Sequence, residues 1–106
     1  MVPPTISQIK DQNGYPVQFF NSAYITTQTT TLVKSGPTFL HSITLNKPAA
    51  TGTIEIDNAI TQTNPIGIIT VPANPQPTTI FYDVYLPTGL SITTGVANQD
   101  ITVSYL

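Results

Sequence analysis

The sequence predicts an all-β protein: a single β-sandwich or jelly-roll-like domain of about seven short antiparallel strands, preceded by an extended N-terminal arm. From about residue 29 onward, apolar and polar residues alternate in short segments that are separated by Pro, Gly and Asn turns. Threonine accounts for 19 of the 106 residues, and this β-branched residue suits the half-exposed face of a sheet. No segment keeps the helical period of about 3.6 residues for more than roughly one turn.

Residues 1–28 are predicted to form the arm, and residues 29–106 the sandwich. The arm contains Pro3, Pro4, Pro16 and a turn signal at Asn13-Gly14, which favour extended chain over helix. It also contains too many apolar residues to remain solvated as a disordered tail. We therefore expect the arm either to wrap around its own domain or to lie on a neighbouring molecule.

In the sandwich, strands are predicted over residues 29–36, 38–46, 53–58, 66–72, 78–87, 90–94 and 100–106. On the strand 78–87 the alternation turns Phe81, Asp83 and Tyr85 to one face, and on 53–58 it turns Glu55 and Asp57 toward solvent. The inward positions are expected to form one core made of Phe39, Ile43, Leu45, Ile54, Ile56, Ile69, Val71, Tyr82, Val84, Leu90, Ile92, Ile101 and Val103.

Two of these strands lack the charges that usually protect a sheet edge. "DITVSYL" at residues 100–106 has no charge after Asp100, and "TFLHSITL" at residues 38–45 has only His41. An uncharged exposed edge is a template for aggregation. Each of the two strands is therefore expected to be central in its sheet or to be covered by another chain.

Composition excludes several classes of function. Charged residues make up 8% of the chain, the formal net charge is -2, and the three basic side chains are Lys10, Lys34 and Lys47. A nucleic-acid or anionic-membrane surface would need a basic face, so neither is a predicted partner. The chain has no cysteine, which excludes disulfides and thiolate metal sites. No apolar run reaches the ~20 residues of a membrane span, and "MVPPTISQIK" does not read as a signal peptide.

No catalytic constellation is predicted. His41 is the one histidine of the chain, and strict alternation would turn the adjacent Ser42 to the opposite face. Asp57 or Asp83 could approach His41 in space, but nothing in the sequence places them there. The protein is therefore not expected to be an enzyme.

No metal or cofactor is predicted either. Glu55, Asp57 and Asn58 in "EIDNA" supply oxygen atoms, but the spacing of a calcium loop is absent. The two carboxylates are better explained as the solvent-facing positions of a strand.

Four segments carry a resemblance: "FLHSITLN", "GTIEIDN", "IFYDVYLPTGLSITTG" and "DITVSYL". Over about residues 37–106 the chain resembles the small β-rich virion proteins of tailed phages, of the capsid decoration (cement) type. The resemblance implies a structural protein that is made in the host cytoplasm and located on the capsid surface of the virion. The implied partners are the major capsid protein and further copies of the chain itself, with a trimer favoured.

Under this hypothesis the arm contacts the shell, with Phe19, Phe20 and Tyr24 as its anchors. The β-body associates with itself, and Tyr85 and Tyr105 are candidate contact residues. Binding of such a protein would stabilise the assembled shell by mass action.

The alternative is a module of a tail fibre or baseplate that binds a surface glycan. Phe81, Tyr82, Tyr85 and Tyr105 would then line an aromatic platform on one face of the sandwich. Packing of these rings in the core or at an interface would explain the same residues.

Overall fold

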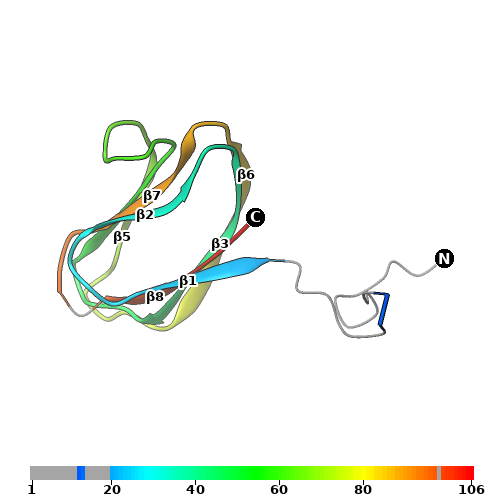
Figure 1. The fold of residues 1–106 in the computed structure, drawn as a ribbon. Coiled ribbons are helices and arrows are strands. Elements are labelled where there is room, and N and C mark those ends of the chain that lie inside the picture. The colour runs from blue at the N-terminus through cyan, green and yellow to red at the C-terminus, as the bar shows by residue number, and fades with distance from the viewer. Residues whose placement is uncertain (1–11, 14–19, 98) are drawn as a thin grey trace.

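Two four-stranded antiparallel sheets pack face to face in the computed structural model, which describes residues 12–13, 20–97 and 99–106 (Figure 1). The strands are β1 (Asn21–Ile25), β2 (Thr30–Ser35), β3 (Thr38–Lys47), β4 (Thr53–Asp57), β5 (Pro65–Thr70), β6 (Thr78–Leu86), β7 (Gly89–Thr94) and β8 (Asp100–Tyr105).

The strand order is β1-β8-β3-β6 in one sheet and β2-β7-β4-β5 in the other. Consecutive strands therefore belong to opposite sheets, with one exception, the hairpin formed by β4 and β5. This connectivity is that of a jelly roll, in which two interlocked Greek keys close an eight-stranded sandwich. The predicted fold class is confirmed.

The seven predicted strands are all present, and the eighth, β1, lies inside the predicted arm. β1 pairs with β8 from Asn21 opposite Tyr105 to Ile25 opposite Ile101, and the side chain of Ile25 is buried in the core. Residues 21–25 therefore belong to the body, and for them the arm wraps its own domain. The expectation of an irregular arm up to residue 28 is wrong for this segment. Residues 1–11 and 14–19 lie outside the described residues.

The two uncharged strands both occupy central positions. β8 lies between β1 and β3, and β3 lies between β8 and β6. Their backbone donors and acceptors are therefore paired on both sides, which explains why neither strand needs a protective charge.

The core lies between the sheets and follows the predicted alternation closely. Ile69, Tyr82 and Val84, which were predicted to be inward, lie at the margin of the core and are only partly buried. The fully or nearly fully buried apolar side chains are Ile25, Leu40, Ile43, Leu45, Ile54, Ile56, Ala59, Val71, Leu86, Leu90, Ile92, Ile101 and Val103.

One core prediction fails because β3 contains an irregularity. Against β8, Leu40 pairs with Tyr105 and Ser42 pairs with Ser104, so β3 accommodates one extra residue at this point. Leu40 is therefore buried together with Ile43, and Phe39 is directed outward instead of inward. A bulge of this kind adds one residue to one strand and reverses the alternation on its far side.

Candidate functional site: an aromatic face on the β1-β8-β3-β6 sheet

The outward positions of β6 carry a ring, a carboxylate and a second ring. Phe81 is 65% exposed and Tyr85 is 60% exposed, with Asp83 between them on the same face. This arrangement was predicted from the alternation and is confirmed. Tyr82 is directed inward, and its hydroxyl group lies next to Gly67 of β5. A Cβ atom added to Gly67 would lie 3.2 Å from the hydroxyl oxygen. Burial raises the pKa of Tyr82.

A bulge places Asp83 beside β3. Leu40 pairs with Val84 and Ser42 pairs with Phe81, so His41 faces two residues of β6. Asp83 has a φ of 48°, in the left-handed region of the backbone that residues other than glycine rarely adopt. Backbone strain of this kind persists only where the surrounding structure holds it, and it is enriched at functional sites.

The strained residue forms a hydrogen bond with the one histidine of the chain. The Nδ1 atom of His41 lies 2.6 Å from Oδ1 of Asp83, and the side chains of His41 and Asp83 are 27% and 55% exposed. The ring of Phe20 stacks on the imidazole with a centroid distance of 4.2 Å and an interplanar angle of 7°. Phe81 meets the imidazole edge-on at 5.4 Å. The imidazole is thus held from three sides, with Nε2 on the side away from Asp83.

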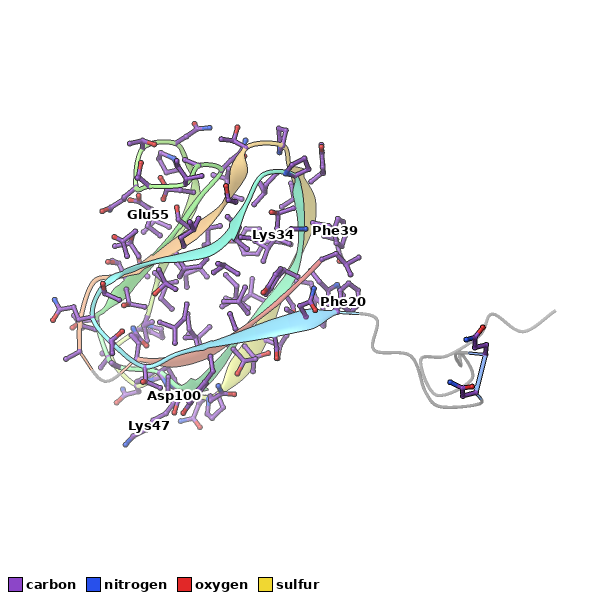
Figure 2. The ribbon with its side chains drawn as sticks, in the orientation of Figure 1. Phe20, Lys34, Phe39, Lys47, Glu55 and Asp100 are labelled. Atoms are coloured by element: carbon purple, nitrogen blue, oxygen red, sulfur yellow. The ribbon has the colours of Figure 1, made fainter. Side chains whose placement is uncertain are left out.

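Phe39 extends the group of rings along β3. It pairs with Tyr85 on one side and exchanges two backbone hydrogen bonds with Leu106 on the other, at 3.1 and 2.8 Å. We refer to Phe20, Phe39, His41, Phe81, Asp83 and Tyr85 as the aromatic face. Figure 2 shows the two labelled rings, Phe20 and Phe39, at the end of the sheet opposite to Lys47 and Asp100.

The remainder of the same sheet surface carries hydroxyl and amide groups. The hydroxyls of Thr44 and Thr79 lie 3.0 Å apart across β3 and β6. Tyr24 of β1 is exposed and donates a hydrogen bond of 2.8 Å to Oδ2 of Asp100. This hydrogen bond raises the pKa of Tyr24, and desolvation and the negative charge of Asp100 add to the effect. Asn46 also donates to Asp100, at 3.1 Å.

The predicted contact residues differ in their position and in their exposure to solvent. Phe20 and Tyr24 both lie on the outer surface of the β1-β8-β3-β6 sheet, and Phe19 lies outside the described residues. Tyr85 is exposed, whereas Tyr105 packs partly against the core. An aromatic platform therefore contains Phe81 and Tyr85 but not Tyr105 or Tyr82.

The pairing of His41 with Asp83 was not predictable from the sequence. The alternation gave the outward direction of Asp83, but it did not give the neighbouring strand. The bulge also invalidates the argument that Ser42 lies on the face opposite to His41, because Ser42 pairs with the outward residues Phe81 and Ser104.

On the other sheet, the loop 58–64 covers a carboxylate that was predicted to face solvent. Asp57 is buried because this loop, drawn in green in Figure 1, folds back over it. Oδ2 of Asp57 accepts a hydrogen bond of 2.9 Å from the backbone N–H of Asn64, and Ser91 Oγ donates to the carbonyl of Thr61 at 3.1 Å. Oδ1 of Asp57 has no hydrogen-bond partner among the described residues.

Glu55 lies beside this buried carboxylate. The hydrogen bond that Glu55 can donate to Asp57 when it is protonated is the largest cause that raises the pKa of Glu55. Desolvation and the negative charge of Asp57 act in the same direction, and Gln62 opposes them. Protonated Glu55 can therefore supply the donor that Asp57 lacks.

The hairpin formed by β4 and β5 also exposes three apolar side chains. Ile60 of the connecting loop and Ile66 and Ile68 of the edge strand β5 are all exposed, with Ile68 at 57%. We refer to these three residues as the isoleucine hairpin. β5 has no charged residue, so this sheet edge is protected only by Pro65 at its start.

Across the described part of the chain, the surface forms no pocket, and no three metal-ligating side chains gather at one point. Within the same residues there is no helix long and apolar enough to cross a membrane. Comparison with known proteins finds no matching family model, no similar curated protein and no similar solved structure.

Proposed function

We propose that this protein is a structural virion protein that binds the outside of a phage capsid and stabilises it. The observation that carries the proposal is the presence of uncharged, exposed apolar side chains on both outer faces of one small body. On the β1-β8-β3-β6 sheet, Tyr24 of the edge strand β1 is 66% exposed, and the isoleucine hairpin lies on the other sheet. Contiguous exposed apolar surface marks interaction sites, and a protein that reinforces a shell must contact more than one neighbour.

The position of β1 supports a role for the N-terminal segment in attachment. β1 is an edge strand, and Phe20, directly before it, stacks on the outer surface of the same sheet. The residues before Phe20 therefore join the body at a sheet edge, from which an apolar, proline-containing segment can reach a neighbouring subunit. Phe20 and Tyr24 lie beside this point and remain the proposed anchors, together with Phe19.

Self-association through the isoleucine hairpin fits the same function. The exposed isoleucines of three copies can pack together around a symmetry axis, and this closure would cover Ile66 and Ile68. The jelly-roll fold is shared by viral capsid proteins and by lectin domains. The fold is thus compatible with the proposal but does not carry it, since one fold serves many functions.

The experiment is a binding assay with capsids of the encoding phage that were assembled without this protein. The full chain is expected to co-sediment with the capsids and to raise the temperature at which they release DNA. A chain that lacks residues 1–19 keeps β1 and should remain folded, but it should bind the capsids at least tenfold more weakly, about 1.4 kcal/mol.

The control is Leu32→Ala, an exposed position on β2 away from both surfaces, which should bind like the unmodified chain. If the full chain does not co-sediment with capsids, the proposal is wrong. If the shortened chain binds as tightly as the full chain, attachment by the N-terminal segment is wrong.

A further inference from the structure

We propose that the aromatic face is a binding site for a neutral oligosaccharide. In this proposal, sugar rings stack on Phe81 and Tyr85, and sugar hydroxyls bond to the His41–Asp83 pair between them. The proposal goes beyond capsid attachment and does not depend on it, because the surfaces assigned to attachment and self-association are the N-terminal segment and the isoleucine hairpin.

The first argument is the placement of the two rings. Phe81 and Tyr85 lie on one face of one strand, four residues apart, and both are largely exposed. At a rise of about 3.4 Å per residue, their Cα atoms are at most about 14 Å apart. The surface around them is open, with no pocket on the described residues. Such an open platform suits several linked sugar units lying along the strand better than one enclosed ring.

The second argument is the polar pair between the rings. His41 and Asp83 hydrogen-bond to each other through Nδ1 and Oδ1, which leaves Nε2 and the second carboxylate oxygen for other partners. An apolar protein surface docked here would bury those atoms without hydrogen bonds, and this is unfavourable. A sugar supplies hydroxyl groups that donate and accept beside C–H faces that stack on aromatic rings.

The third argument is that the polar pair is held in place before any ligand binds. Asp83 has a left-handed backbone conformation and its carboxylate contacts Nδ1 of His41, while Phe20 stacks on the face of the imidazole. A binding group that is already fixed loses little conformational entropy on binding. The combination of backbone strain, hydrogen bond and stacking is more than the packing of a solvent-exposed sheet surface requires.

The fourth argument concerns charge and selects a neutral ligand. Among the described residues the lysines are Lys34, on β2 of the other sheet, and Lys47, at the far end of β3 (Figure 2). Among these described residues no lysine lies on the aromatic face, which carries the carboxylate of Asp83. A sulfated or phosphorylated glycan would find no counter-charge there and would approach a carboxylate.

The test uses the full chain on an array of neutral and sulfated oligosaccharides, followed by calorimetric titration of the neutral hexasaccharide that binds best. Phe81→Ala and Tyr85→Ala are each expected to weaken that binding by about threefold to tenfold, in line with the loss of one stacked ring. Asp83→Asn should also weaken it, because the amide orients the imidazole less well. Leu32→Ala, at an exposed apolar position on the other sheet, is the matched control and should bind like the unmodified chain.

Circular dichroism and light scattering check that each variant keeps the fold and the molar mass of the unmodified chain. Both ring positions are exposed, so the variants should keep the native spectrum and the molar mass of the unmodified chain. The proposal is overturned if no neutral glycan binds, if only sulfated glycans bind, or if both ring variants bind as tightly as the unmodified chain. A change of molar mass in Tyr85→Ala would also overturn it, since the face would then be a self-association surface. Capsid binding should be unaffected by Phe81→Ala, which separates this proposal from the attachment function.

Discussion

At the scale of single residues, Asp83 combines a left-handed backbone conformation with a side chain in the proposed oligosaccharide site. Its φ of 48° is unfavourable for L-residues, although less so for Asn and Asp than for others, and only glycine adopts it freely. Asp83→Asn and Asp83→Val both remove the carboxylate, so their difference reports the backbone conformation together with the hydrogen bond that the asparagine oxygen can still accept from His41. We expect the valine variant to be less stable than the asparagine variant by roughly 1–2 kcal/mol, measured as the free energy of unfolding in urea. Equal stabilities would mean that the bulge relaxes out of the left-handed conformation without penalty.

Glu55 gives the second prediction at this scale. Its raised pKa means that the folded state holds the proton more tightly than the unfolded chain does. The stabilisation is therefore fully present below the unfolded pKa of about 4.3 and is lost as the pH rises through the higher folded-state value. Glu55→Gln keeps a donor for Oδ1 of Asp57 at every pH. We expect the variant to melt at the same temperature as the unmodified chain near about pH 4, and at a higher temperature near about pH 7.

The control for this prediction is Glu55→Ala, which removes the repulsion between the two carboxylates but supplies no donor. Its gain in melting temperature at neutral pH should be smaller than that of Glu55→Gln. Equal gains for both variants would show that repulsion alone, and not the missing hydrogen bond, governs the pH dependence.

Phe39 shows where the alternation of apolar and polar residues no longer predicts which side chains are buried. Alternation correctly gave the burial of Ile43 and Leu45 and the exposure of Phe81 and Tyr85. It failed at Phe39, since a bulge is fixed by the pairing of three strands and leaves no mark in the residues of one strand. Asp57 was misplaced for a related reason: whether a loop folds back over a strand position depends on tertiary contacts.

At the scale of elements, β1 is the strand that the sequence did not predict. "NSAYI" is short, and Ile25 is its one buried side chain, so its strand conformation depends on pairing with β8 more than on its own composition. For β3 and β8 the lack of charge left two possibilities, a central position or an edge covered by another chain, and the structure shows the central position. The His41–Asp83 pair and the stacking of Phe20 were not predictable, since they require the strand order of the sheet.

A pair of truncations tests the status of β1. Removal of residues 1–19 leaves β1 in place, and we expect a melting temperature close to that of the full chain. Removal of residues 1–28 takes away Ile25 and exposes the uncharged edge of β8, so it should lower the free energy of unfolding by at least about 2 kcal/mol and promote aggregation. Unfolding in urea and light scattering measure the two effects. Equal stability of both truncations would mean that β1 contributes no more than a loosely docked segment.

At the scale of the whole molecule, the two exposed surfaces differ in chemistry, and the two proposed roles rest on this difference. The isoleucine hairpin is purely apolar and lies at an uncharged sheet edge, as suits contact with a second copy of the same chain. The aromatic face combines rings with a polar pair, as suits a ligand that offers hydroxyl groups. One body can therefore assemble through one sheet and bind a ligand through the other.

The molar mass in solution tests whether the isoleucine hairpin is the self-association surface. We expect light scattering after gel filtration to give about three times the chain mass of 11.4 kDa, with a trimer closed through the isoleucine hairpin. Ile68→Lys places a charge on the β5 edge and should shift the mass to that of one chain, whereas Leu32→Lys on the opposite edge strand should not. Because few charges are involved, the mass should change little between about 0.1 M and about 1 M salt, where charge-driven contacts would be screened. A monomer in the unmodified chain would leave both apolar surfaces free in solution, and β5 would then have to find its covering strand on the capsid.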